Sequence, residues 1–171
     1  MNHEDGLGGS ITILEHGNER APMRFRIVMP RGMQPPAPEC HPTQSEAFTV
    51  LRGTLDLGVV DGRHVVLHAG DRFHLPAGVY HLPANRTDDE LEFEGVLTPG
   101  LESADMFTDL YAVMREHRGL GRFARVAMVF RHYRRTITFK PVVAFAMRIV
   151  AGVATALKLR VRTEAAIARA D

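Results

Sequence analysis

The stretch ECHPTQSEAFTVLRG, residues 39–53, places carboxylate and imidazole side chains within a few positions of one another. In an extended strand, residues two apart point to the same face, so Glu39 and His41 share a face while Cys40 points away. Glu46 follows five positions after His41, an odd offset that would place it on the opposite face of a straight strand. We therefore expect the chain to bend before Glu46 and to turn its carboxylate back toward His41.

A second stretch, GDRFHLPAGVYHLPAN at residues 70–85, contains another metal-ligand side chain, His81. Imidazole and carboxylate together suit Mn, Fe, Co, Ni or Zn. Cys40 is the only cysteine, which excludes both a thiolate cage and an intramolecular disulfide. The two stretches therefore predict a divalent metal site with nitrogen and oxygen ligands.

Both stretches resemble the motifs of the cupin family, and the resemblance covers roughly residues 20–100. The first is similar to the first cupin motif, and the second matches the other motif at its defining positions Gly70, Pro76, Gly78, His81 and Asn85. The resemblance implies a jelly-roll β-barrel that holds one metal ion. Carried over position by position, it implies His41, Glu46 and His81 as ligands of that ion.

Glu39 stands where the cupin family normally has its first histidine. As a fourth ligand, Glu39 would give two carboxylates and two imidazoles, a set that favours the harder ions iron(II) and manganese. If Glu39 does not bind the ion, two histidines and one carboxylate remain, as in non-haem iron oxygenases, and Glu39 is free to act as a general base. The sequence also admits a cupin that has lost its metal and kept only the fold.

The rest of residues 1–100 has the pattern of short strands, in which apolar and polar residues alternate between turn residues. The Asp61-Gly62 pair favours a tight hairpin after a strand over residues 54–60. We expect a mainly β fold: an antiparallel barrel over residues 1–100, followed by a helical extension over residues 101–171 that is not an independent domain.

The helical extension shows apolar spacings of three and four. Phe107, Leu110, Tyr111 and Met114 would line one face of a first helix with Ser103 as its cap. Gly119 and Gly121 would end that helix, residues 123–130 would form a second, and Pro141 would begin a third, with Ala144, Ala151 and Ala154 on a smooth side. The pattern predicts an entirely helical segment.

Charge is divided between the two segments of the chain, whose formal net charge is +1. Residues 1–100 carry 8 Lys/Arg against 14 Asp/Glu, whereas residues 101–171 carry 13 against 6. Either the two segments attract each other or the basic one contacts an acidic partner. The polar first ten residues are unlike a secretory signal, so we expect a cytoplasmic protein.

Several other residues that could carry chemistry have simpler interpretations. Cys40 is expected to be a packed small residue, and Gln44 either reaches a bound molecule or caps the loop. His64, His68 and His74 are expected on outward or rim positions. The arginines Arg131, Arg134 and Arg135 most simply form a solvated face, and no nucleic-acid partner is expected.

We expect a metalloenzyme of the oxygenase or isomerase type, with one ion of Fe, Mn, Zn or Ni and with Glu39 as ligand or acid/base group. The alternative is a non-catalytic barrel that binds or senses a small molecule. Residues 142–157 are strongly apolar but too short and too interrupted, by Arg148, to span a bilayer. They would pack on the barrel or on a second subunit, giving a homodimer, or lie peripherally on a membrane.

Overall fold

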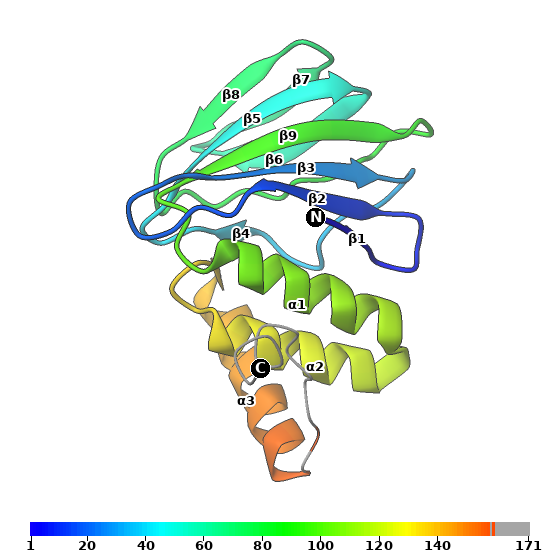
Figure 1. Ribbon diagram of the computed structural model, residues 1–171, viewed down its shortest axis with the longest axis vertical. Coiled ribbons are helices and arrows are strands. Elements are labelled where there is room, and N and C mark those ends of the chain that lie inside the picture. The colour runs from blue at the N-terminus through cyan, green and yellow to red at the C-terminus, as the bar shows by residue number, and fades with distance from the viewer. Residues whose placement is uncertain (158, 160–171) are drawn as a thin grey trace.

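The computed structural model describes residues 1–157 and 159. Its larger sheet has six strands: β1 (Asn2–Glu4), β2 (Ser10–Glu15), β3 (Met23–Met29), β5 (Ser45–Arg52), β8 (Arg72–Leu75) and β9 (Leu91–Thr98). Its strands run antiparallel to their neighbours in the order β1-β2-β3-β9-β5-β8 (Figure 1). All six strands lie within residues 1–100, where the sequence pattern predicted short strands. β1 and β2 form one edge of the sheet.

Two smaller pairs of strands complete the β structure. β6 (Thr54–Val60) and β7 (Arg63–His68) form the predicted hairpin, and Asp61 and Gly62 have φ angles of 47° and 79°, as a tight turn of this kind requires. β4 (Glu39–Cys40) pairs with β10 (Thr138–Phe139), which comes from the C-terminal segment. The expectation that residues 101–171 are entirely helical is therefore wrong at β10.

The barrel core is built from the inward-facing residues of these strands. Phe25, Phe48 and Phe93 are almost completely buried, and the Phe48 and Phe93 ring centroids lie 5.9 Å apart. Each such ring contributes on the order of 1.5 to 3 kcal/mol through burial. Ala104 and Tyr111 from the first helix belong to the same core cluster.

Three helices occur within residues 1–157: α1 (Ser103–Glu116), α2 (Gly119–His132) and α3 (Pro141–Ala156). They lie together on one side of the strands, with α1 nearest to them (Figure 1). α2, α3 and β10 share a second apolar cluster with part of α1. α1 also contributes Ala104 and Tyr111 to the barrel core cluster, so its apolar face packs against the barrel.

The helix boundaries differ in detail from the predicted ones. α1 ends at Glu116, and Gly119 and Gly121 lie inside α2 instead of ending α1. Ser103 is the first helical residue and makes no capping hydrogen bond. Pro141 begins α3 as predicted, because a proline at the first helical position loses no hydrogen bond. Arg135 forms an ion pair at 3.1 Å with Glu19, which links the basic segment to the acidic one.

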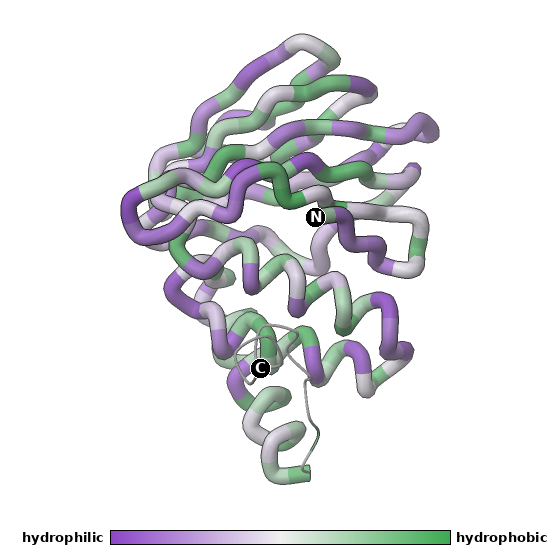
Figure 2. The backbone as a smooth tube through the Cα atoms, in the orientation of Figure 1, coloured by the Kyte–Doolittle hydropathy of each residue, from purple (hydrophilic) through white to green (hydrophobic). Residues whose placement is uncertain are grey.

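One side of α3 packs inward and the other is exposed. Ala151 and Ala154 are buried, as the predicted smooth side requires, whereas Val142, Phe145 and Ile149 are each more than half exposed. Figure 2 shows the apolar colouring along this helix. No helix among the described residues is long and apolar enough to cross a membrane. A homodimer contact and a membrane contact through α3 both stay predictions.

Candidate metal centre

Backbone pairing places Glu39 opposite His81. The two residues exchange a pair of hydrogen bonds, each 2.9 Å from nitrogen to oxygen. Directly opposed residues of an antiparallel pair project to the same face, which brings the two side chains together. On its other edge, Glu39 is paired with Phe139 of β10.

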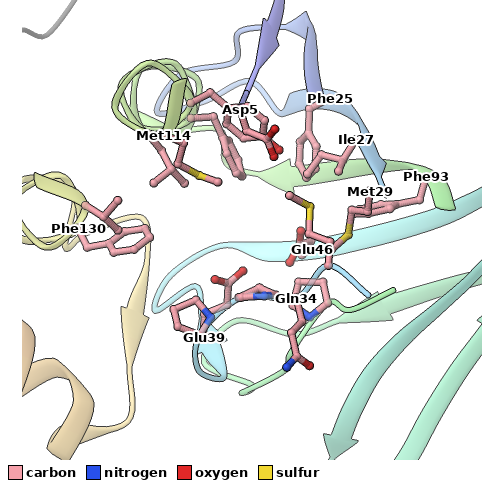
Figure 3. Close-up of a pocket in the computed structure, with 18 of the residues that line it drawn as sticks. Asp5, Phe25, Ile27, Met29, Gln34, Glu39, Glu46, Phe93, Met114 and Phe130 are labelled. Carbon is pink, nitrogen blue, oxygen red and sulfur yellow. The ribbon is translucent and has the colours of Figure 1, made fainter. Parts of the chain in front are cut away.

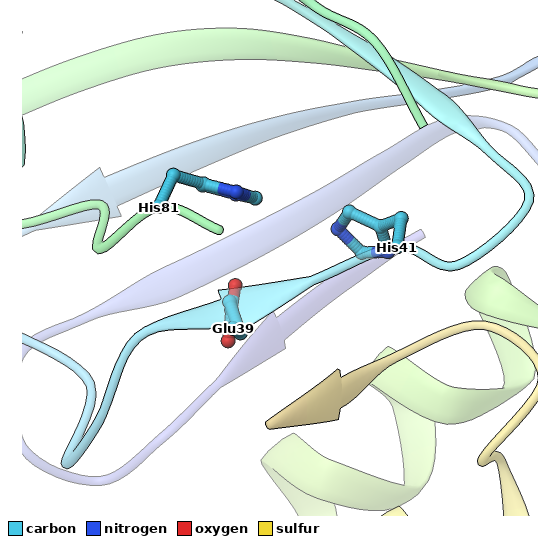
Figure 4. Close-up of side chains that lie close together, drawn as sticks. All are labelled: Glu39, His41 and His81. Atoms are coloured by element: carbon cyan, nitrogen blue, oxygen red, sulfur yellow. The ribbon is translucent and has the colours of Figure 1, made fainter. Parts of the chain in front are cut away.

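Glu39, His41 and His81 converge on one point, as Figure 4 shows. One ligand atom from each residue lies within 4.8 Å of the others. His41 and His81 are buried, and Glu39 is half buried. Cys40, expected to point away from this face, does not line the cavity that Glu39 and His41 line; it is buried, and burial raises the pKa of its thiol.

Glu46, on β5, approaches both histidines. Its Oε2 atom lies 3.4 Å from Nε2 of His41 and 3.0 Å from Nε2 of His81. Residues 42–44 leave the extended conformation, so the chain bends as expected before Glu46. The structure thus brings the four residues singled out from the sequence into a single cluster.

Backbone carbonyls orient both imidazoles. Nδ1 of His41 lies 2.5 Å from the carbonyl oxygen of Thr136, and Nδ1 of His81 lies 3.2 Å from that of Val79. A carbonyl only accepts hydrogen bonds, so each Nδ1 carries a proton, and each Nε2 is left to face Glu46. Metal-binding histidines commonly donate their second N–H in this way.

The pKa values in the metal-free protein reflect this crowding. Burial raises the pKa of Glu46, but the attraction of His41 and His81 outweighs it and lowers the pKa to about 2. Burial lowers the pKa of His81, but Glu46 and, to a smaller extent, Glu39 raise it to about 9. Burial raises the pKa of Glu39 despite the neighbouring histidines.

The donor atoms suit a divalent cation. Oε2 of Glu46 and Nε2 of His81 are buried, and although they are 3.0 Å apart, neither has a hydrogen-bond partner. In the neutral tautomer, Nε2 is an acceptor that faces a carboxylate acceptor, an arrangement that only a proton or a metal ion relieves. Two imidazoles and two carboxylates fit Mn, Fe, Co, Ni or Zn.

A cavity of about 210 Å³ adjoins the cluster (Figure 3). Glu39, His41 and Glu46 line it on the barrel side. Aromatic and aliphatic side chains from both the barrel and the helices form most of the remaining wall: Phe25, Phe48 and Phe93 from the barrel, and Phe107, Leu110, Tyr111, Met114, Val126, Phe130 and Phe139 from the C-terminal segment. The helices therefore form one wall of the cavity.

The other residues considered from the sequence fall outside the cavity. Gln44 does not line it; its amide nitrogen donates to the carbonyls of Pro99 and Gly100 and to Oγ of Ser103, so Gln44 fastens the start of α1. His64, His68 and His74 are exposed, as expected, and so are Arg131, Arg134 and Arg135.

The structure also adds residues that no sequence pattern indicated. Thr136 acts through a backbone carbonyl, which leaves no trace in its residue type. Asp5, an acid in a polar N-terminal segment, is completely buried and lines the cavity. Among these additional parts of the site, the sequence indicated only the apolar face of α1, and it did not indicate which surface that face contacts.

Comparison with known proteins agrees with this architecture. Residues 25–98 match the family model described as a cupin domain. Similar solved structures include an RmlC-like cupin from Shewanella frigidimarina (24% identity, TM-score 0.49, covering 60% of this chain and 86% of that chain). Another is a sugar phosphate isomerase of the cupin superfamily from Silicibacter pomeroyi (21% identity, TM-score 0.47, covering 57% and 69%). No curated protein matches the sequence.

The matched residues contain both predicted motifs and the strands β3 to β9. The remaining described residues are an N-terminal strand pair and the C-terminal helices with β10. Residues 25–98 of this chain are a cupin domain.

Proposed function

We propose that the protein binds one divalent metal ion through His41, Glu46 and His81, with Glu39 as the fourth ligand. The observation that carries the proposal is the convergence of these side chains, with ligand atoms of Glu39, His41 and His81 within 4.8 Å of one another. Glu39, His41 and Glu46 also line the cavity. The Glu46 and His81 atoms support the proposal, since two acceptors 3.0 Å apart must share either a proton or a metal ion. Two carboxylates among four ligands favour iron or manganese over copper.

The protein acts, we infer, as a mononuclear metalloenzyme of the oxygenase or isomerase type on a small molecule held in the cavity. A bound ion supplies Lewis-acid polarisation of a substrate oxygen. The apolar walls exclude water and hold the molecule against the cluster. If Glu39 instead stays off the ion, its carboxyl group, whose pKa is raised by burial, lines the cavity and can hold or release a proton beside the reacting atoms.

Metal analysis of protein purified without a tag tests the metal site. We expect about one equivalent of iron or manganese per chain, and its loss in His41→Ala and His81→Ala. His64→Ala and His74→Ala are matched controls, because both side chains are exposed. Circular dichroism shows whether each variant keeps its β structure. Full metal retention in both ligand variants would overturn the assignment.

The second candidate is a non-catalytic barrel that senses a small molecule and docks through its C-terminal segment. The exposed apolar side chains of α3 favour it, because such a row is unusual on a surface without a partner. An empty metal site in the purified protein, together with binding of a small molecule, would support this candidate over the enzyme.

A further inference from the structure

The cavity has a second polar end, formed by Asp5. Asp5 lies in the segment that connects β1 to β2, and its side chain is completely buried. Its Oδ1 atom accepts hydrogen bonds from the backbone N–H groups of Leu7 (2.6 Å) and Gly9 (3.0 Å), which fix the orientation of the carboxylate. Its Oδ2 atom is buried and has no hydrogen-bond partner. Figure 3 shows Asp5 across the cavity from Glu39.

Asp5 lines the cavity, and its Oδ2 atom packs against Gly9. A Cβ atom at position 9 would come within 2.5 Å of Oδ2, so Gly9 is what permits this position. Tyr111 lies nearby, and the pKa of its hydroxyl is raised first by burial and then by the charges of Asp5 and Glu39. Tyr111 therefore lies within electrostatic reach of both ends of the cavity.

Among the described residues, neither lysine nor arginine faces Asp5 across the cavity. No lysine or arginine lines the cavity, and none forms an ion pair with Asp5. Oδ2 is therefore a buried acceptor without a hydrogen bond, and a ligand that donates to it satisfies this atom. A bound divalent ion would neutralise Glu39 and Glu46, but it would lie at the other end of the cavity from Asp5.

We propose that the cavity binds a small apolar amine, whose ammonium group donates to Oδ2 of Asp5 and whose apolar body lies along Phe25 and Phe107. The ring centroids of these two residues are 5.3 Å apart. A cavity of about 210 Å³ exceeds the roughly 150 Å³ that holds benzene in another protein, so one ring with a short chain fits. Aromatic faces also favour a cation beside them. Carboxylates and phosphates are disfavoured by Asp5.

The inference rests on the proposed function only in placing the far end of the amine beside the metal cluster. Binding at Asp5 depends on its own contacts, so the two proposals fail separately. Amine selectivity in a protein that holds no metal would overturn the metal site alone. One equivalent of metal without amine selectivity would overturn the amine proposal alone.

Calorimetry with three matched probes tests the inference: phenethylamine, phenethyl alcohol and hydrocinnamate, which carry a cation, a neutral donor and an anion on the same ring and chain. We expect the full chain to bind the amine at least about tenfold more tightly than the alcohol, and the anion not at all. Equal binding of amine and alcohol, or preferred binding of the anion, would overturn the proposal. This comparison uses the unaltered protein and does not depend on any variant folding.

Asp5→Asn sharpens the result, since it keeps the shape of the side chain and removes its charge. Amine affinity should fall at least about tenfold, while alcohol affinity stays within about twofold. Asp61→Asn, an exposed position in the β6–β7 turn, is the control and should change neither. Unchanged amine affinity in folded Asp5→Asn would place the amine elsewhere and overturn the assignment to Asp5.

Discussion

The barrel and the helical segment form opposite walls of one cavity but contribute different things to it. The cupin domain, residues 25–98, supplies the carboxylates and imidazoles of the metal cluster, each fixed by strand pairing or by a carbonyl. The helical wall supplies apolar side chains, together with the carbonyl of Thr136 that orients His41. Metal chemistry and ligand shape are therefore separable by mutation, except at Thr136, where the two walls meet.

The largest expected effect comes from the barrel wall. In His81→Ala, a ligand atom is lost and Glu46 loses its closest partner, 3.0 Å away. We expect metal affinity to fall by more than about 100-fold while the helices remain folded, as measured by competition with a chromophoric chelator. His68→Ala, on the exposed end of β7, is the control. A loss of less than about threefold in His81→Ala would remove it from the ligand set.

The second prediction tests the place where the walls meet. Two shortened chains, one ending at Arg135 and one at Lys140, both lack α3 and differ in Thr136 and β10. The shorter chain loses the carbonyl that faces His41 and the strand that pairs with Glu39. Metal affinity should be about 10- to 100-fold weaker in the shorter chain. Equal affinities in two folded chains would show that β10 is dispensable for the site.

The third prediction concerns protons that compete with the metal. Because Glu46 raises the pKa of His81 to about 9, this imidazole is protonated at neutral pH in the metal-free protein, and a metal must displace that proton. His41, whose pKa is also raised, and the carboxylates Glu39 and Glu46 face the same space. Apparent metal affinity should rise at least about tenfold per pH unit between pH 6 and 8 and level off above pH 9. A flat profile would contradict it.

Glu39→His should change metal preference more than metal affinity. The exchange restores the usual cupin ligand set, removes one negative charge and adds a nitrogen donor. Softer, nitrogen-preferring ions should gain, so we expect the preference to shift from manganese or iron toward nickel, copper or zinc. Competition between equimolar metals measures the shift. An unchanged order would mean that Glu39 does not touch the ion and would leave its acid/base role.

The smallest effect on the site should come from the outer surface of the helical wall. Phe145 is 64% exposed and does not line the cavity. Phe145→Ser should leave metal content unchanged and alter unfolding by less than about 0.5 kcal/mol. If α3 forms the predicted homodimer contact, light scattering should show a dimer for the parent and a shift toward monomer for the variant. A parent that is already monomeric would contradict the homodimer.

The cupin domain was largely predictable because each of its features has a chemical signal in the sequence. Asp61-Gly62 indicates a hairpin, and the spacing of Glu39, His41 and Glu46 indicates a bent strand with ligands on one side. For the helical wall, the sequence predicted the helices but not their position, since an apolar face does not indicate which surface it packs against. Thr136 could not be found at all, because it acts through a backbone group that every residue has.

Pairing between β4 and β10 also fixes when the metal site can be completed during synthesis. His41 is oriented by a carbonyl 95 positions later in the chain. At typical translation rates of 5 to 20 residues per second, that carbonyl is made about 5 to 20 s after the histidine. The nascent barrel can therefore contain all four ligand residues and still lack the Thr136 carbonyl that orients His41. This arrangement of ligands is complete only once Thr136 has been added, and not in the barrel as it first emerges.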